Sequence, residues 1–186
     1  MDSSLFLLNC SLGVLWVLVY VDDIIITGNN TKLLNWFVTQ LDNVFSLKDL
    51  GPLHFFLGIE VHRPHMGLHL SQTAYINELL RRTNMLDCKS NPSPTSTSAH
   101  LGASIGSPLS DVFLYRSTIG MLQYLTITRP EISFIVNKLS QFMQAPTDAH
   151  WSACKRVLRF LQGSKMFGLL LRPSPHLRIT GFTDAD

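Results

Sequence analysis

Residues 18–28 read LVYVDDIIITG, and this stretch decides the fold of the N-terminal part of the chain. Two adjacent carboxylates, Asp22 and Asp23, stand here between apolar runs that are rich in β-branched residues. Apolar runs of this kind favour strands, so the stretch predicts a hairpin with the acid pair at its tip. Because neighbouring carboxylates repel each other, the pair is either a solvated polar turn or a site for hard divalent cations such as Mg²⁺.

The apolar residues that precede the acid pair extend from Leu5 to Val21. Polar residues and a glycine interrupt them at 9–13, which predicts two strands, Leu5–Leu8 and Val14–Val21, joined by a turn. A membrane anchor is the alternative interpretation of the same run. The anchor is disfavoured because the uninterrupted piece is too short to span a bilayer as a helix and no basic residue precedes it.

The residues after the acid pair predict a mixed order of strands and helices. A third strand at 24–27 leads through Gly28-Asn29-Asn30 into an amphipathic helix that ends near Ser46. Further along we expect a strand at 55–61, a hairpin through Gly67, a short helix at 75–80, a Ser/Thr/Pro-rich loop at 88–110, helices at 111–126, 130–143 and 146–163, and paired strands at 168–171 and 178–182.

Composition supports a chain that buries much of its surface. Of the 186 residues, 46% are hydrophobic and 15% are charged, which excludes general disorder. Three cysteines without a CxxC pair exclude a disulfide framework and a zinc ribbon. Residues 1–50 carry two basic and five acidic residues, whereas residues 51–186 carry 13 basic and eight acidic ones. This asymmetry suits either a polyanion held near bound cations or an ordinary solvated surface.

Taken in order, the blocks of the chain resemble the reverse transcriptase of Ty1/copia-type retrotransposons. The resemblance begins at residues 18–28 and continues through KDLGPLHFFLGIEV at 48–61, LSQTAY at 70–75, TRPEIS at 128–133, PTDAHW at 146–151 and KRVLR at 155–159. The chain is also similar to the short plant mitochondrial open reading frames that are relics of such elements.

The resemblance implies an α+β fold in which a partial polymerase palm, made of antiparallel strands with a packed helix, precedes helical regions. It assigns residues 1–70 to the palm with its primer-grip hairpin, 71–87 to the start of the thumb, 88–110 to a linker, 111–165 to a helical thumb and connection, and 166–186 to the truncated start of a ribonuclease H-like domain.

The resemblance also implies roles for individual residues. Asp22 and Asp23 correspond to the catalytic carboxylates that hold two Mg²⁺ ions, for which Mn²⁺ could substitute. Tyr20 corresponds to the aromatic residue that packs near the primer end. Phe56, Leu57 and Gly58 correspond to the primer grip, and Asp184 to the first metal carboxylate of ribonuclease H.

Lys155, Arg156 and Arg159 share part of one helix face and are either contacts to a nucleic-acid backbone or a solvated face. The partners that the family implies are an RNA template, a DNA primer, dNTP and the polyprotein segments that this sequence lacks, with no membrane. The implied location is intracellular: cytoplasm or nucleus for an active element, or the mitochondrion for a plant relic.

Intact enzymes of this family place a third catalytic Asp on an earlier strand and carry fingers, and neither precedes Asp22 in this sequence. Two metal ions need more ligands than two carboxylates offer. We therefore expect the chain to be a polymerase fragment that is inactive alone. The alternative is a non-catalytic remnant that binds nucleic acid.

Overall fold

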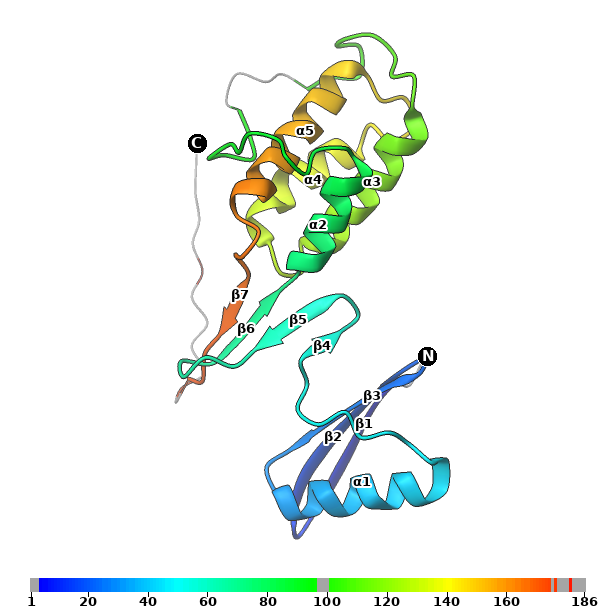
Figure 1. The fold of residues 1–186 in the computed structure, drawn as a ribbon, viewed down its shortest axis with the longest axis vertical. Helices are drawn as coiled ribbons and strands as arrows, with labels where there is room; N and C mark the ends of the chain where they lie inside the picture. The colour runs from blue at the N-terminus through cyan, green and yellow to red at the C-terminus, as the bar shows by residue number, and fades with distance from the viewer. Residues whose placement is uncertain (1–3, 97–100, 175, 177–180, 182–186) are drawn as a thin grey trace. The chain divides into compact units, whose positions relative to one another are not determined.

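The computed structural model describes residues 4–96, 101–174, 176 and 181, and the chain divides into two compact units at residue 56. Figure 1 shows strands and one helix in the first unit and most of the helices in the second. The mixed helix and strand content and the antiparallel pairing agree with the predicted α+β class.

The first unit is a three-stranded sheet with one helix. Strands β1 (Leu5–Cys10), β2 (Gly13–Tyr20) and β3 (Asp23–Gly28) pair antiparallel in the order β1-β2-β3. These elements confirm the strands predicted from the apolar runs. Within the described residues, no helix is long and apolar enough to cross a membrane. The apolar run at 5–21 therefore forms sheet, as the strand interpretation expected.

Helix α1 (Thr31–Phe45) packs on one face of this sheet (Figure 1). Asn30 begins the helix, since its side-chain oxygen accepts hydrogen bonds from the backbone amides of Lys32 and Leu33. Ser46 ends the helix in the left-handed conformation, where the sequence placed its end. The buried residues of this unit are Leu15 and Val17 of β2 and Leu33 of α1, so the face towards the helix holds a small core.

The second sheet contains β4 (Phe55–Phe56), β5 (Ile59–His62), β6 (Leu68–Ser71) and β7 (Leu169–Leu171), in that order. The prediction of one strand at 55–61 is wrong, because a turn at Leu57-Gly58 divides it into β4 and β5. The strand predicted at 168–171 is present as β7, yet it pairs antiparallel with β6. Its expected partner at 178–182 lies almost wholly outside the described residues.

The close approach of β7 explains a glycine in the β5-β6 connection. Gly67 has φ +149°, and a Cβ atom at this position would lie 2.1 Å from the carbonyl oxygen of Leu171. No side chain fits that distance, so the chain can bring β7 alongside β6 only with glycine here.

The helices of the second unit enclose its main core. They are α2 (Thr73–Arg82), α3 (Val112–Leu125), the 3₁₀ helix η1 (Pro130–Ile132), α4 (Ser133–Ser140) and α5 (Asp148–Gly163). The single helix predicted at 130–143 is thus a 3₁₀ turn followed by an α-helix that ends at Ser140. Each helix supplies fully buried apolar side chains, among them Ile76, Leu79, Leu80, Ile119, Leu122, Leu125, Leu139, Val157, Leu158 and Leu161.

The loop that follows α2 is held against α5 in its first part. The Asn91 amide donates to the carbonyl of Arg159 (3.2 Å), and Nε of Arg156 donates to the carbonyl of Thr95 (3.0 Å). Residues 93–96 are half-buried as a result. The Ser/Thr/Pro composition predicted an exposed loop, and these hydrogen bonds explain why this part is partly covered.

Arg129 lies between α3 and η1 and is completely buried. Its guanidinium donates to the Glu131 carboxylate (2.6 Å), to the backbone carbonyl of Ser164 (3.0 Å) and to the Ser164 hydroxyl (2.6 Å). The rings of Phe160 and Phe167 lie 5.6 Å and 5.8 Å from the guanidinium carbon. One side chain therefore joins the α3-η1 corner to the end of α5 and to the chain that enters β7.

We expect Arg129→Met to lower the free energy of unfolding of the second unit by about 2 kcal/mol, because it leaves the Ser164 carbonyl without its donor and the half-exposed Glu131 carboxylate without its partner. Denaturant unfolding followed by circular dichroism measures the change. Arg172→Met is the matched control, since Arg172 is exposed and its replacement is expected to shift stability by no more than roughly 0.5 kcal/mol. Equal losses in the two variants would contradict the role given to Arg129.

Candidate functional site

The acid pair lies at the tip of the β2-β3 hairpin. Tyr20 and Asp23 are the last directly paired residues, so Val21 and Asp22 form a two-residue loop. Both carboxylates are exposed. Val21 has φ +50°, a left-handed conformation that costs a β-branched residue about 1–2 kcal/mol. Backbone strain of this kind is concentrated at functional turns, and here it accompanies the two carboxylates.

Tyr20 and Asp23 leave the same face of the sheet because they are directly opposite in the register. This face is the one that α1 does not cover, since Tyr20 is an odd number of residues from the buried Val17. Trp16 shares it and is 44% exposed, as Tyr20 is at 51%. The carboxylate of Asp23 therefore borders an apolar surface that includes two aromatic rings.

The donor set of the tip fits a hard divalent cation in part. Two exposed carboxylates offer the oxygen ligands that Mg²⁺ and Mn²⁺ accept. Within the described residues, no group of three or more His, Cys, Asp or Glu side chains could hold a metal ion. Further ligands for an ion at Asp22 and Asp23 would be oxygen atoms of another kind, such as a substrate phosphate, water or a backbone carbonyl.

Leu57 and Gly58 form the turn between β4 and β5, and both have positive φ, at 49° and 82°. Two consecutive positive φ angles are typical of a type I′ hairpin turn. The Tyr124 hydroxyl of α3 donates to the Leu57 carbonyl. The Tyr124 ring packs edge-to-face on Tyr75 of α2, with centroids 5.2 Å apart. Burial raises the pKa of the Tyr75 hydroxyl, and the nearby Tyr124 adds to this effect.

The strand after this turn supports α2 through a residue that the sequence did not single out. An oxygen of the Glu60 carboxylate accepts a hydrogen bond from the Ala74 amide (2.7 Å) in the first turn of α2, and the other accepts one from the Ser71 hydroxyl (3.4 Å). The N-cap residue of α2, Gln72, makes no side-chain capping bond. The negative charge of Glu60 takes its place and stabilises the amide groups at the start of the helix. Only the fold brings Glu60 to the helix, so the sequence carried no signal for it.

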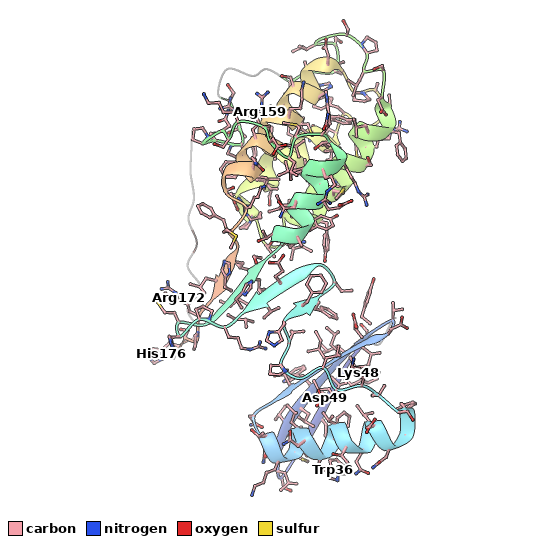
Figure 2. All side chains as sticks on the ribbon, in the orientation of Figure 1. Trp36, Lys48, Asp49, Arg159, Arg172 and His176 are labelled. Carbon is pink, nitrogen blue, oxygen red and sulfur yellow. The ribbon has the colours of Figure 1, made fainter. Side chains whose placement is uncertain are left out.

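The three basic residues predicted on α5 differ in whether they line a hollow of the structure. Arg156 and Arg159 border a hollow beside α4. Figure 2 labels Arg159, which belongs to α5. Lys155 is not among the residues that line the hollow. Successive residues of an α-helix are rotated by roughly 100°, so Lys155 leaves α5 in a different direction from Arg156. Asp184, the predicted ribonuclease H carboxylate, lies outside the described residues.

Comparison with known proteins gives a consistent result. The family model described as reverse transcriptase (RNA-dependent DNA polymerase) matches residues 2–97. The retrovirus-related Pol polyprotein from transposon RE2 of Arabidopsis thaliana is 48% identical over 185 residues, which cover 100% of this chain and 13% of the polyprotein. The Pol polyprotein from transposon RE1 of the same plant is 47% identical over the same lengths. This chain thus spans about an eighth of these two relatives.

A smaller relative is an uncharacterized mitochondrial protein of Arabidopsis thaliana, which is 43% identical over 92% of this chain and 71% of its own length. No solved structure matches the chain. The chain belongs to the reverse transcriptase (RNA-dependent DNA polymerase) family. Within that family it is reverse transcriptase sequence of the Ty1/copia-type Pol polyproteins.

Replacing glycine by alanine should have opposite effects at two positions of the second unit. At Gly58 a Cβ atom has room, with its nearest neighbour at 3.6 Å, so only the positive φ opposes it. We expect Gly58→Ala to destabilise by about 1 kcal/mol. At Gly120, inside α3, nothing lies within 4 Å of the added atom, and Gly120→Ala should stabilise by about 1 kcal/mol.

Thermal unfolding of the two variants beside the unsubstituted chain measures both changes. Gly58→Asn is the control for the backbone, because Asn tolerates positive φ better than Ala. A Gly58→Ala variant as stable as Gly58→Asn would contradict the assignment of a left-handed turn residue.

Proposed function

We propose that this chain supplies part of the active site of the RNA-directed DNA polymerase of a Ty1/copia retrotransposon, with Asp22 and Asp23 as metal-binding catalytic carboxylates. The observation that carries the proposal is the exposed acid pair at the tip of an apolar hairpin, in a chain of the reverse transcriptase family. Mg²⁺, or Mn²⁺ in its place, would activate the 3′-hydroxyl of the primer and stabilise the leaving pyrophosphate.

The chain's own residues would orient the reacting groups. The Asp22 and Asp23 carboxylates would hold positive charge at the hairpin tip, and the Tyr20 ring, on the same sheet face as Asp23, would pack against the primer end. The turn at Phe56, Leu57 and Gly58 would serve as primer grip. Its anchorage through the Tyr124 hydroxyl supports this role, because a grip must hold the primer backbone in one position.

The proposed assignment of segments to subdomains follows the resemblance to the family. Strands and helix up to residue 70 would be the palm, the helices from 71 onward the thumb and connection with a linker at 88–110, and residues 166–186 the start of a ribonuclease H-like domain, with Asp184 as its first carboxylate. The substrates would be an RNA template, a DNA primer and dNTP. Of the three basic residues predicted on α5, Arg156 and Arg159 would contact the nucleic-acid backbone.

A second candidate function is non-catalytic binding of nucleic acid. It is favoured by the basic excess of residues 51–186 and by the lack, among the described residues, of a third acid near the pair. We propose an intracellular location: cytoplasm or nucleus for an element that still transposes, or the mitochondrion for a plant relic.

Primer extension on an RNA template tests the enzymatic part. We expect the 186-residue chain to incorporate no dNTP with Mg²⁺ or Mn²⁺, because two metal ions need more ligands than Asp22 and Asp23 offer. Template-dependent extension that disappears in Asp22→Asn would contradict the expected inactivity of the chain, while it would support the role of the carboxylate.

Binding of Mn²⁺, followed by the relaxation of water protons, tests the metal part separately. The chain should bind Mn²⁺ weakly, and Asp22→Asn combined with Asp23→Asn should remove that binding. Asp42→Asn, an exposed acid in α1, is the matched control. Equal Mn²⁺ binding by the double variant would exclude the hairpin tip as a cation site.

A further inference from the structure

A hollow of about 480 Å³ lies between α4, α5 and the chain segment that precedes residue 97. Its floor on α5 is made of the small side chains Ala149, Ser152 and Ala153, which recur at helical spacing. Because these side chains fill little space, α5 leaves room beside α4. The volume is within the range of sites that bind small molecules or single units of a polymer.

Three basic residues border this hollow: Lys138 of α4, and Arg156 and Arg159 of α5. Among the described residues, no Asp or Glu lines the hollow and none of the three cations takes part in a salt bridge. Nε of Arg156 donates to the Thr95 carbonyl, which fixes the guanidinium at the rim. Cations that gather around one concave site without an acidic partner attract an anion.

An aromatic ring stands beside these charges. Phe134 precedes Lys138 by one helical turn on α4, is 73% exposed and lines the hollow. It also lines a second hollow, where the amide side chains of Gln123 and Asn137 lie. A large apolar ring left in solvent next to basic groups is the arrangement on which nucleic-acid bases stack while their phosphates bind the cations.

We propose that this hollow binds one nucleotide unit of a single-stranded stretch of nucleic acid. The phosphodiester contacts Lys138, Arg156 and Arg159, and its base stacks on Phe134. This inference rests on the proposed function, since it assumes that the chain works on nucleic acid. Of the three basic residues predicted on α5 it keeps Arg156 and Arg159, and it adds Lys138 and Phe134 of α4. A duplex keeps its bases stacked on one another, so it can use the cations of the hollow and not the ring.

Fluorescence anisotropy with labelled oligo-dT and the full 186-residue chain tests the proposal over a series of salt concentrations. Lys138→Gln combined with Arg159→Gln should lower the affinity at least tenfold and reduce the slope of log K against log salt by about 0.7, because the contact to one phosphate of a single strand is lost. Phe134→Ala should lower the affinity by roughly tenfold without changing the slope.

Lys155→Gln is the matched control, since it removes one positive charge from the same helix outside the hollow. It should change the affinity no more than twofold. An RNA–DNA hybrid serves as the second probe, and Phe134→Ala should leave its affinity unchanged. Unaltered far-ultraviolet circular dichroism and melting temperature in each variant show that the fold is retained.

Three results would overturn the inference. The first is that the unsubstituted chain binds no oligonucleotide, and the second is that Lys155→Gln weakens binding as much as Lys138→Gln with Arg159→Gln does. The third is displacement of the strand by dTTP at equal phosphate concentration, which would assign the hollow to a free nucleotide. Each of them leaves the proposed role of Asp22 and Asp23 standing, because Mn²⁺ binding tests that role at the hairpin tip.

Discussion

A buried positive charge is the constraint on which the second unit depends. The Arg129 guanidinium is completely buried, and each of its three nitrogens donates a hydrogen bond to an acceptor in the protein. Ser164 supplies two acceptors, Glu131 supplies the countercharge, and Phe160 and Phe167 flank the planar group. The end of α5 and the entry to β7 are thereby fixed at the α3-η1 corner, and the core helices are packed in one arrangement.

The sequence predicted the elements whose determinants are local. The β-branched runs around Asp22 and Asp23 identified β2 and β3, and helical spacing identified α1 and α3. The start at Pro146-Thr147-Asp148 and the glycine at 163 identified α5. The acid pair was predictable for the same reason, since both carboxylates and the strands that present them are adjacent in the chain. The turn at Leu57-Gly58 was missed because Leu57 continues the apolar run. The Asn-Gly or Asp-Gly pair that usually indicates such a turn is not present at this position.

Features that depend on packing between distant segments could not be predicted from pattern alone. The bond from Tyr124 to the Leu57 carbonyl joins residues that only the fold brings together, and the same holds for Glu60 at the start of α2. The role of Arg129 was hidden because a single arginine before a helix resembles an ordinary surface residue. On α5 the types of the basic residues were visible, but only the packing against α4 decides which of them face the hollow.

The pairing of β7 with β6 also has a consequence for how the protein is made. The chain emerges from the ribosome from its N-terminus, so β5 and β6 leave it long before residues 169–171 are synthesised. Until then the outer edge of β6 presents unpaired backbone groups. Pairing β7 with β6 closes a loop between Ser71 and Leu169, and the entropic cost of closing it slows folding. Translation of residues 72–168 therefore sets the time for which the nascent chain exposes a strand edge to other chains.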